Sequence, residues 1–212
     1  MAFFLLAAVA HAAPATPEGP VVEVDYSNPG LAPAHWLLTL HPDGTGHFKS
    51  ERGNAAMTEG FDAPNIDRDI TVSKAFAQRV FASARAHRYF GTDCDSHLKV
   101  AFQGWKRLTY RGPDGQGSCT FNYSKDKSMQ DLGDSLVAVS SAIVEGARLE
   151  TLLQHDPLGL DHEMDYLVDA AGDGRVQQLC VIRGILTKLA QDDAVMERVR
   201  KRARLLLARA DG

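Results

Sequence analysis

The hydrophobic pattern of this 212-residue chain is mainly alternating, with one helical stretch at 73–89, until its period becomes helical from Ser128. Before that point, apolar residues alternate with polar ones in short runs, as at Val21–Tyr26. After it they recur every three or four residues, as at Leu132, Leu136, Val139 and Ile143. Alternation is typical of half-buried strands, and the longer spacing of amphipathic helices. The sequence therefore predicts an α+β protein: an antiparallel sheet of hairpins packed by helices, followed by an all-helical C-terminal segment.

Turn residues and helix caps give the expected element boundaries. Ser73 is a candidate N-cap, Ser128 with Asp131 resembles a capping box, and Gly104 suggests a bulge. The stretch from Gly53 to Arg68 has no clear period and is expected to be a loop. Strands are expected at 21–26, 35–40, 45–51, 99–110 and 118–124, and helices at 73–89, 128–153, 161–171, 175–190 and 193–210.

The N-terminus has features of a secretory signal peptide. The apolar run from Phe3 to Val9 precedes Ala10-His11-Ala12, which has the small-x-small form of a cleavage site. No Lys or Arg precedes the run, so a frayed or buried N-terminal segment stays open as the alternative. We divide the chain into a signal peptide (1–12), a flexible segment (13–20), an α+β domain (21–153) and a C-terminal helical segment packed on it (154–212).

Export gives meaning to the three cysteines, because disulfides persist in oxidising compartments. Cys94 lies in a polar loop and Cys119 in an expected strand, and we predict a disulfide between them. Cys180 lies in an apolar helical pattern and is expected to be a free, buried thiol. A nucleophilic Cys94 with His97 as base is the alternative, but the two flanking aspartates would raise the pKa of the thiol.

Composition narrows the classes of function. The chain is 44% hydrophobic and 24% charged, as in ordinary globular proteins. Its net charge of -4 gives no basis for nucleic-acid binding. No stretch after the leader approaches the roughly 18 apolar residues of a membrane span, so we expect a soluble periplasmic or secreted protein without a transmembrane segment in its mature chain. It has no Gly-x-Ser-x-Gly elbow and no phosphate loop, so no cofactor is expected.

One strand interleaves aromatic and basic residues, as interface hot spots do. We take Trp105, Arg107 and Tyr110 as candidate binding residues. The leading hypothesis is a non-catalytic envelope module that binds an unknown protein, peptide or glycan through the exposed sheet face and the loop at 53–68. In the alternative interpretation, Trp105 caps the core and the cations lie on the wet face of the sheet.

A second cluster supports the runner-up hypothesis, a metal-dependent hydrolase with its site between His155 and Glu163. His155, Asp161 and His162 are residue types that bind Zn²⁺ or another divalent cation, although their spacing matches no standard site. Ordinary turn and N-cap roles explain the acidic residues equally well. A third hypothesis is a structural assembly protein whose C-terminal helices pair with those of a partner.

Overall fold

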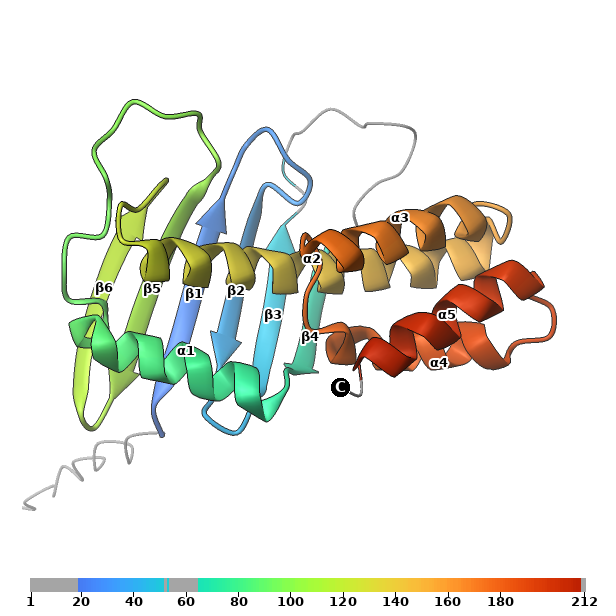
Figure 1. Cartoon of the computed structure of the whole chain (residues 1–212), viewed down its shortest axis with the longest axis horizontal. Helices are drawn as coiled ribbons and strands as arrows, with labels where there is room; N and C mark the ends of the chain where they lie inside the picture. The colour runs from blue at the N-terminus through green and yellow to red at the C-terminus, as the bar shows by residue number, and fades with distance from the viewer. Residues whose placement is uncertain (1–18, 52, 54–64, 211–212) are drawn as a thin grey trace, which may run out of the picture.

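The computed structural model describes residues 19–51, 53 and 65–210. Within these residues, six strands form one antiparallel sheet in the order β4-β3-β2-β1-β5-β6 (Figure 1). The predicted α+β class is confirmed. The strands are β1 (Val21–Ser27), β2 (His35–Leu40), β3 (Thr45–Glu51), β4 (Ile66–Thr71), β5 (Trp105–Gly112) and β6 (Gly115–Phe121).

Two helices, α1 (Lys74–Ala86) and α2 (Lys127–His155), cross the same face of the sheet (Figure 1). Alternate strand residues point toward them, so Leu38, Phe48 and Leu108 are completely buried. The side chains between them point to the opposite face, which is polar and open to solvent. The sheet therefore has one packed face and one accessible face.

Strand β4 was not predicted, and its first three residues fall in the stretch expected to be a loop. Its inner face carries Ile66, Arg68 and Ile70, so a charged residue interrupts the apolar alternation. Arg68 is accommodated by two hydrogen bonds, of 3.1 and 2.8 Å, to the Glu150 carboxylate on α2. An ion pair across the packed face thus takes the place of an apolar contact. Residues 54–64 of the expected loop lie outside the described residues.

Side-chain caps begin both long helices. The predicted N-cap of α1 is confirmed, since Ser73 Oγ accepts a 3.2 Å hydrogen bond from Phe76 N. The predicted cap of α2 at Ser128 is wrong by two residues: the helix begins at Lys127, and the carboxylate of Asp126 accepts hydrogen bonds from Ser128 N and Met129 N. An aspartate at this position is as good a cap as the expected serine, and its charge also favours the helix dipole.

Helix α2 is 29 residues long, about 43 Å, and it belongs to two hydrophobic cores. Its first half packs under the sheet through Leu136 and Val139, whereas its second half packs among the C-terminal helices through Leu149 and Leu152. Gly146 permits close approach there, because a Cβ at this position would lie 2.3 Å from Ile182. The predicted boundary between residues 153 and 154 stays a prediction, since this one helix serves both cores.

The C-terminal helices pack against one another beyond β4 (Figure 1). The single helix expected at 175–190 is not formed. Gln178 has a left-handed conformation, residues 179–182 form a short 3₁₀ helix, and the α-helix begins only at Arg183. These elements are α3 (Leu160–Asp173), η2 (Leu179–Ile182), α4 (Arg183–Gln191) and α5 (Glu197–Ala210).

A buried acidic pair joins α2 to α3. Glu163 of α3 is 3% exposed and forms a 2.8 Å ion pair with Arg148 of α2. Glu145, one turn earlier on α2, adjoins Glu163, and burial together with that neighbouring carboxyl raises the pKa of Glu145 to about 8. The folded protein therefore keeps Glu145 protonated at neutral pH, so that only one negative charge faces Arg148.

This raised pKa predicts that stability falls with rising pH. The contribution of Glu145 to the free energy of unfolding is complete at pH values below 4.5, the ordinary pKa of glutamate. It is lost as the pH rises toward 8. Replacing Glu145→Gln, which mimics the protonated acid, should flatten the pH dependence of the unfolding free energy by up to about 1.4 kcal/mol per pH unit in that interval. Urea denaturation at pH 5, 6, 7 and 8 measures it. Asp169→Asn, at an exposed position of α3, should keep the wild-type slope, and parallel curves for Glu145→Gln and wild type would contradict this assignment.

Candidate functional site

The structure separates the three predicted binding residues. Trp105 and Arg107 occupy odd positions of β5 and point to the open face of the sheet. Tyr110 occupies an even position, is 1% exposed and donates its hydroxyl hydrogen bond to Asp114. Its prediction as a binding residue is therefore corrected. Residues of one strand share a face only at spacings of two, which Trp105 and Tyr110 do not have.

Trp105 and Arg107 border a hollow of about 380 Å³ on the open face, together with Asp25, Ser27 and Thr120. Trp105 is 47% exposed, so it does not cap the core. Arg107 Nε donates a 3.3 Å hydrogen bond to Thr120 Oγ1. Asp25, its cross-strand neighbour, is instead 3.0 Å from His35. In the part of the chain that the structure describes, no carboxylate forms an ion pair with Arg107.

Residues 98–104 extend this surface in a way that the sequence did not predict. The strand expected at 99–110 begins only at Trp105, and the preceding residues form an exposed connection outside the sheet. Phe102 packs edge-to-face on Trp105, with ring centroids 6.0 Å apart. We call the four large exposed side chains of this region the apolar strip: Leu98 (52% exposed), Val100 (40%), Phe102 (49%) and Trp105 (47%).

Hydrogen bonds from other elements hold the backbone of the strip. The Asn122 side chain accepts from Gln103 N at 2.7 Å and donates to Ala101 O at 3.2 Å. Tyr26 donates its hydroxyl to Gln103 O at 2.8 Å. Gly104 has a φ of +103°, and a Cβ there would lie 2.4 Å from the Tyr26 ring. Gly104 thus ends the connection, in place of the bulge expected at this position, and the β1–β5 register beyond it is unbroken.

A disulfide secures the chain just before the strip. The predicted pair Cys94–Cys119 is present, with the two Cα atoms 5.9 Å apart. Beside it, Ser96 N donates a 2.8 Å hydrogen bond to Tyr123 O, so this connection runs alongside the end of β6 (Figure 1). Cys180 is free, as expected, and is partly buried.

The candidate metal ligands do not converge. His155 ends α2, whereas Asp161 and His162 lie in the first turn of α3. The Asp161 carboxylate is occupied by Arg198 and Arg202 of α5, at 2.6 and 2.7 Å. In residues 19–51, 53 and 65–210 no group of three or more His, Cys, Asp or Glu side chains could hold a metal ion. The hydrolase hypothesis gains no support from this segment.

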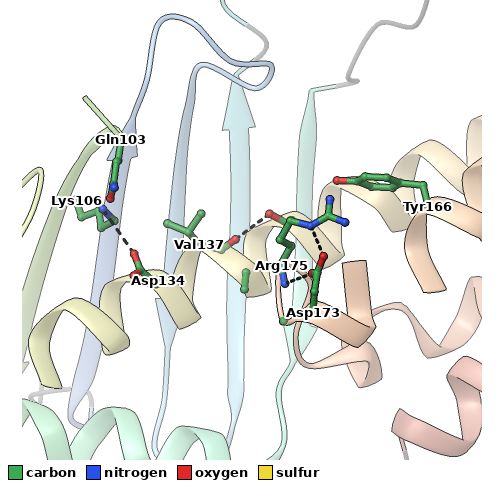
Figure 2. A pocket seen from close by; sticks show the side chains of 10 residues that line it. Gln103, Lys106, Asp134, Val137, Tyr166, Asp173 and Arg175 are labelled. Carbon is green, nitrogen blue, oxygen red and sulfur yellow. Dashed lines mark hydrogen bonds and ion pairs between the residues drawn. The ribbon is translucent and has the colours of Figure 1, made fainter. Parts of the chain in front are cut away.

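A second hollow lies on the helical side of the sheet, and sequence reasoning missed it. This Lys106 pocket has a volume of about 470 Å³ (Figure 2). Lys106 comes from β5 and points toward Asp134 of α2, while Tyr166 of α3 and Arg175 lie at the opposite side. Lys106 is 2% exposed, and this burial lowers the pKa of its ammonium, whereas Asp134 acts to raise it. The signal in the sequence is the even position of Lys106, shared with the core residue Leu108.

Comparisons with known proteins give no family for this chain. No protein-family model matches the sequence, and no curated protein matches it. In the described portion of the chain, no helix combines the length and the apolar character that crossing a membrane requires.

The role of Gly104 can be tested by limited proteolysis at Lys99, within the strip. Gly104→Ala places a methyl group against the Tyr26 ring. It also puts a residue with a side chain at a positive φ, which L-residues other than glycine rarely adopt. We expect trypsin to cut after Lys99 about tenfold faster in this variant, because the connection opens more often. Gly172→Ala on α3, where a Cβ meets open space, is the matched control. Equal cleavage rates for Gly104→Ala and wild type would show that the strip is held by other contacts.

Proposed function

We propose that this is a non-catalytic binding module of an exported protein, and that its apolar strip and the adjoining open face bind a protein or peptide. The partner presents apolar side chains together with a carboxylate. The observation that carries this proposal is the strip itself, in which four large apolar side chains are 40–52% exposed and the neighbouring Ala101 and Gln103 are tied by their backbone to Asn122 and Tyr26.

A fixed and exposed apolar strip favours association. Its backbone is already ordered, so a partner would not have to supply the free energy for ordering it. Full burial of a large apolar side chain contributes on the order of 1.5–3 kcal/mol, and covering the exposed half of each strip residue contributes about half of that. Tryptophan and arginine are also the residues most enriched at interface hot spots, and Trp105 and Arg107 stand two residues apart on the same face.

The charges near the strip indicate an acidic feature in the partner. Lys99 and Arg107 are exposed, and neither forms an ion pair with a carboxylate of the described residues. The nearby carboxylates of Asp93 and Asp25 are instead paired with histidines at 2.8 and 3.0 Å. The unpaired cations beside apolar groups complement a peptide carrying Asp, Glu or a C-terminal carboxylate.

The aliphatic side chains favour a protein or peptide over a glycan. Leu98 and Val100 offer no hydrogen-bonding group, so they would desolvate sugar hydroxyls without replacing their bonds to water.

The proposed location is the periplasm or the extracellular space. The Cys94–Cys119 disulfide supports it, because such bonds persist in oxidising compartments. The predicted signal peptide at residues 1–12 and the flexible segment at 13–20 cannot add to this support, since residues 1–18 lie outside the described residues.

Selection from a random peptide library displayed on phage tests the proposal. We expect enriched peptides to combine aromatic or aliphatic residues with at least one carboxylate. Trp105→Ala and Arg107→Gln should each weaken their binding at least about tenfold, which corresponds to about 1.4 kcal/mol.

Leu158→Ala is the matched control, because it removes an apolar side chain that is 78% exposed far along the chain from the strip. Thermal denaturation should show that all three variants remain folded. Peptides that bind the Trp105→Ala and Arg107→Gln variants as tightly as wild type would overturn the assignment of this surface.

A further inference from the structure

Lys106 occupies a position where the fold calls for an apolar residue. It is 2% exposed on the packed face of the sheet, in a strand whose other inward side chains are Leu108 and Tyr110. Its ammonium lies 5.4 Å from the centre of the Phe121 ring. A buried lysine opposes stability unless its charge is well compensated. The compensation within the described residues is slight, which points to a role other than packing.

The ammonium is incompletely bonded. It has three N–H donors, and the acceptor it meets within hydrogen-bond distance in the described chain is Asn122 O, at 3.0 Å. The nearest carboxylate oxygen, Asp134 Oδ1, is 4.0 Å away, beyond hydrogen-bond distance. Asp134 receives 2.9 Å hydrogen bonds from Gln130, and its side chain is 55% exposed. A cation and an anion thus stand side by side at the pocket without closing on each other.

The helix that covers Lys106 leaves room for it. Gly133 of α2 lies directly over the lysine, and a Cβ there would approach Lys106 Cδ to 2.9 Å and Phe121 Cζ to 2.8 Å. Any other residue would displace the lysine or the ring. The glycine therefore lets the ammonium reach the pocket from beneath α2, although glycine inside a helix is less favourable than alanine.

The rest of the pocket suits an apolar group. Val137 and Ala138 of α2 line it, and Tyr166 stands at the far side with the Arg175 guanidinium 5.1 Å from its ring centre (Figure 2). Arg175 is held by Asp173, which accepts from its Nε at 2.8 Å. The volume of about 470 Å³ is within the usual range of about 300–1,000 Å³ for small-molecule sites.

We propose that the Lys106 pocket binds a free α-amino acid with an apolar side chain. Its carboxylate accepts from Lys106 and its ammonium donates to Asp134, while the side chain lies over Val137 toward Tyr166. The carboxylate and ammonium of an amino acid flank a single Cα, which matches a cation and an anion 4.0 Å apart. The site is distinct from the apolar strip, although Gln103, which lines the pocket, is the chain neighbour of Phe102 in the strip.

Isothermal titration calorimetry with L-phenylalanine tests the proposal on the full chain. Two analogues serve as controls: 3-phenylpropionate, which lacks the ammonium, and 2-phenylethylamine, which lacks the carboxylate. We expect L-phenylalanine to bind at least about tenfold more tightly than either analogue, since each loses one charge-assisted contact. No detectable heat with L-phenylalanine at millimolar concentration, or equal binding of 3-phenylpropionate, would overturn the proposal.

Two variants separate binding from folding. Lys106→Met keeps the length of the side chain without its charge, so it should abolish binding while leaving the melting temperature equal or higher. Asp134→Asn should weaken L-phenylalanine at least about tenfold but leave 3-phenylpropionate unchanged. Lys201→Met, at an exposed position of α5, is the control and should bind as wild type does. A lower melting temperature for Lys106→Met would show that the lysine serves the fold, and would also overturn the proposal.

Discussion

Burial of two successive stretches of α2, one under the sheet and one among the C-terminal helices, holds the two hydrophobic cores together. Leu136 and Val139 belong to the first stretch, Leu149 and Leu152 to the second, and no break in the helix separates them. The ion pair between Arg68 and Glu150 adds a contact between the edge of the sheet and the second stretch. Melting α2 along its whole length would expose apolar surface in both cores, so the cores should lose their structure together.

Much of this fold follows from local patterns in the sequence. Alternating residues give five of the six strands, and Ser73 gives the start of α1. Strand β4 escaped prediction because Arg68 sits where an apolar residue would complete the alternation. Only the tertiary structure brings Glu150 to it, from a position more than eighty residues later in the chain. Local pattern cannot reveal such a compensating partner.

The two candidate surfaces show a related limit. Leu98, Val100 and Phe102 alternate as in a strand, but the backbone groups of the residues between and after them, Ala101 and Gln103, bond to the side chains of Asn122 and Tyr26 and not to a neighbouring strand. Period alone cannot distinguish these two cases. Lys106 differs from these residues, because it stands two positions before Leu108 in the strand. That spacing alone identifies it as facing the core. Because lysine is charged, Lys106 was expected on the solvent-exposed face of the sheet. Its position in the strand places it on the packed face.

Gln103 connects the strip to the pocket. It lines the Lys106 pocket, while its neighbour Phe102 stands in the apolar strip, and its backbone is held by Asn122 and Tyr26. The same hydrogen bonds therefore position a residue of each surface, so a change in this short connection would be felt at both.

The disulfide between Cys94 and Cys119 also affects how readily one copy of the protein can associate with another. Strand β6 is the last strand of the sheet, and the connection that the disulfide fixes runs alongside its end. An uncovered terminal strand offers unpaired backbone groups to another chain, and adjacent apolar side chains make such pairing more favourable. Reduction of one covalent bond would thus loosen the cover of a strand end beside four exposed apolar residues. The solubility of this protein is in that sense linked to the redox state of its surroundings.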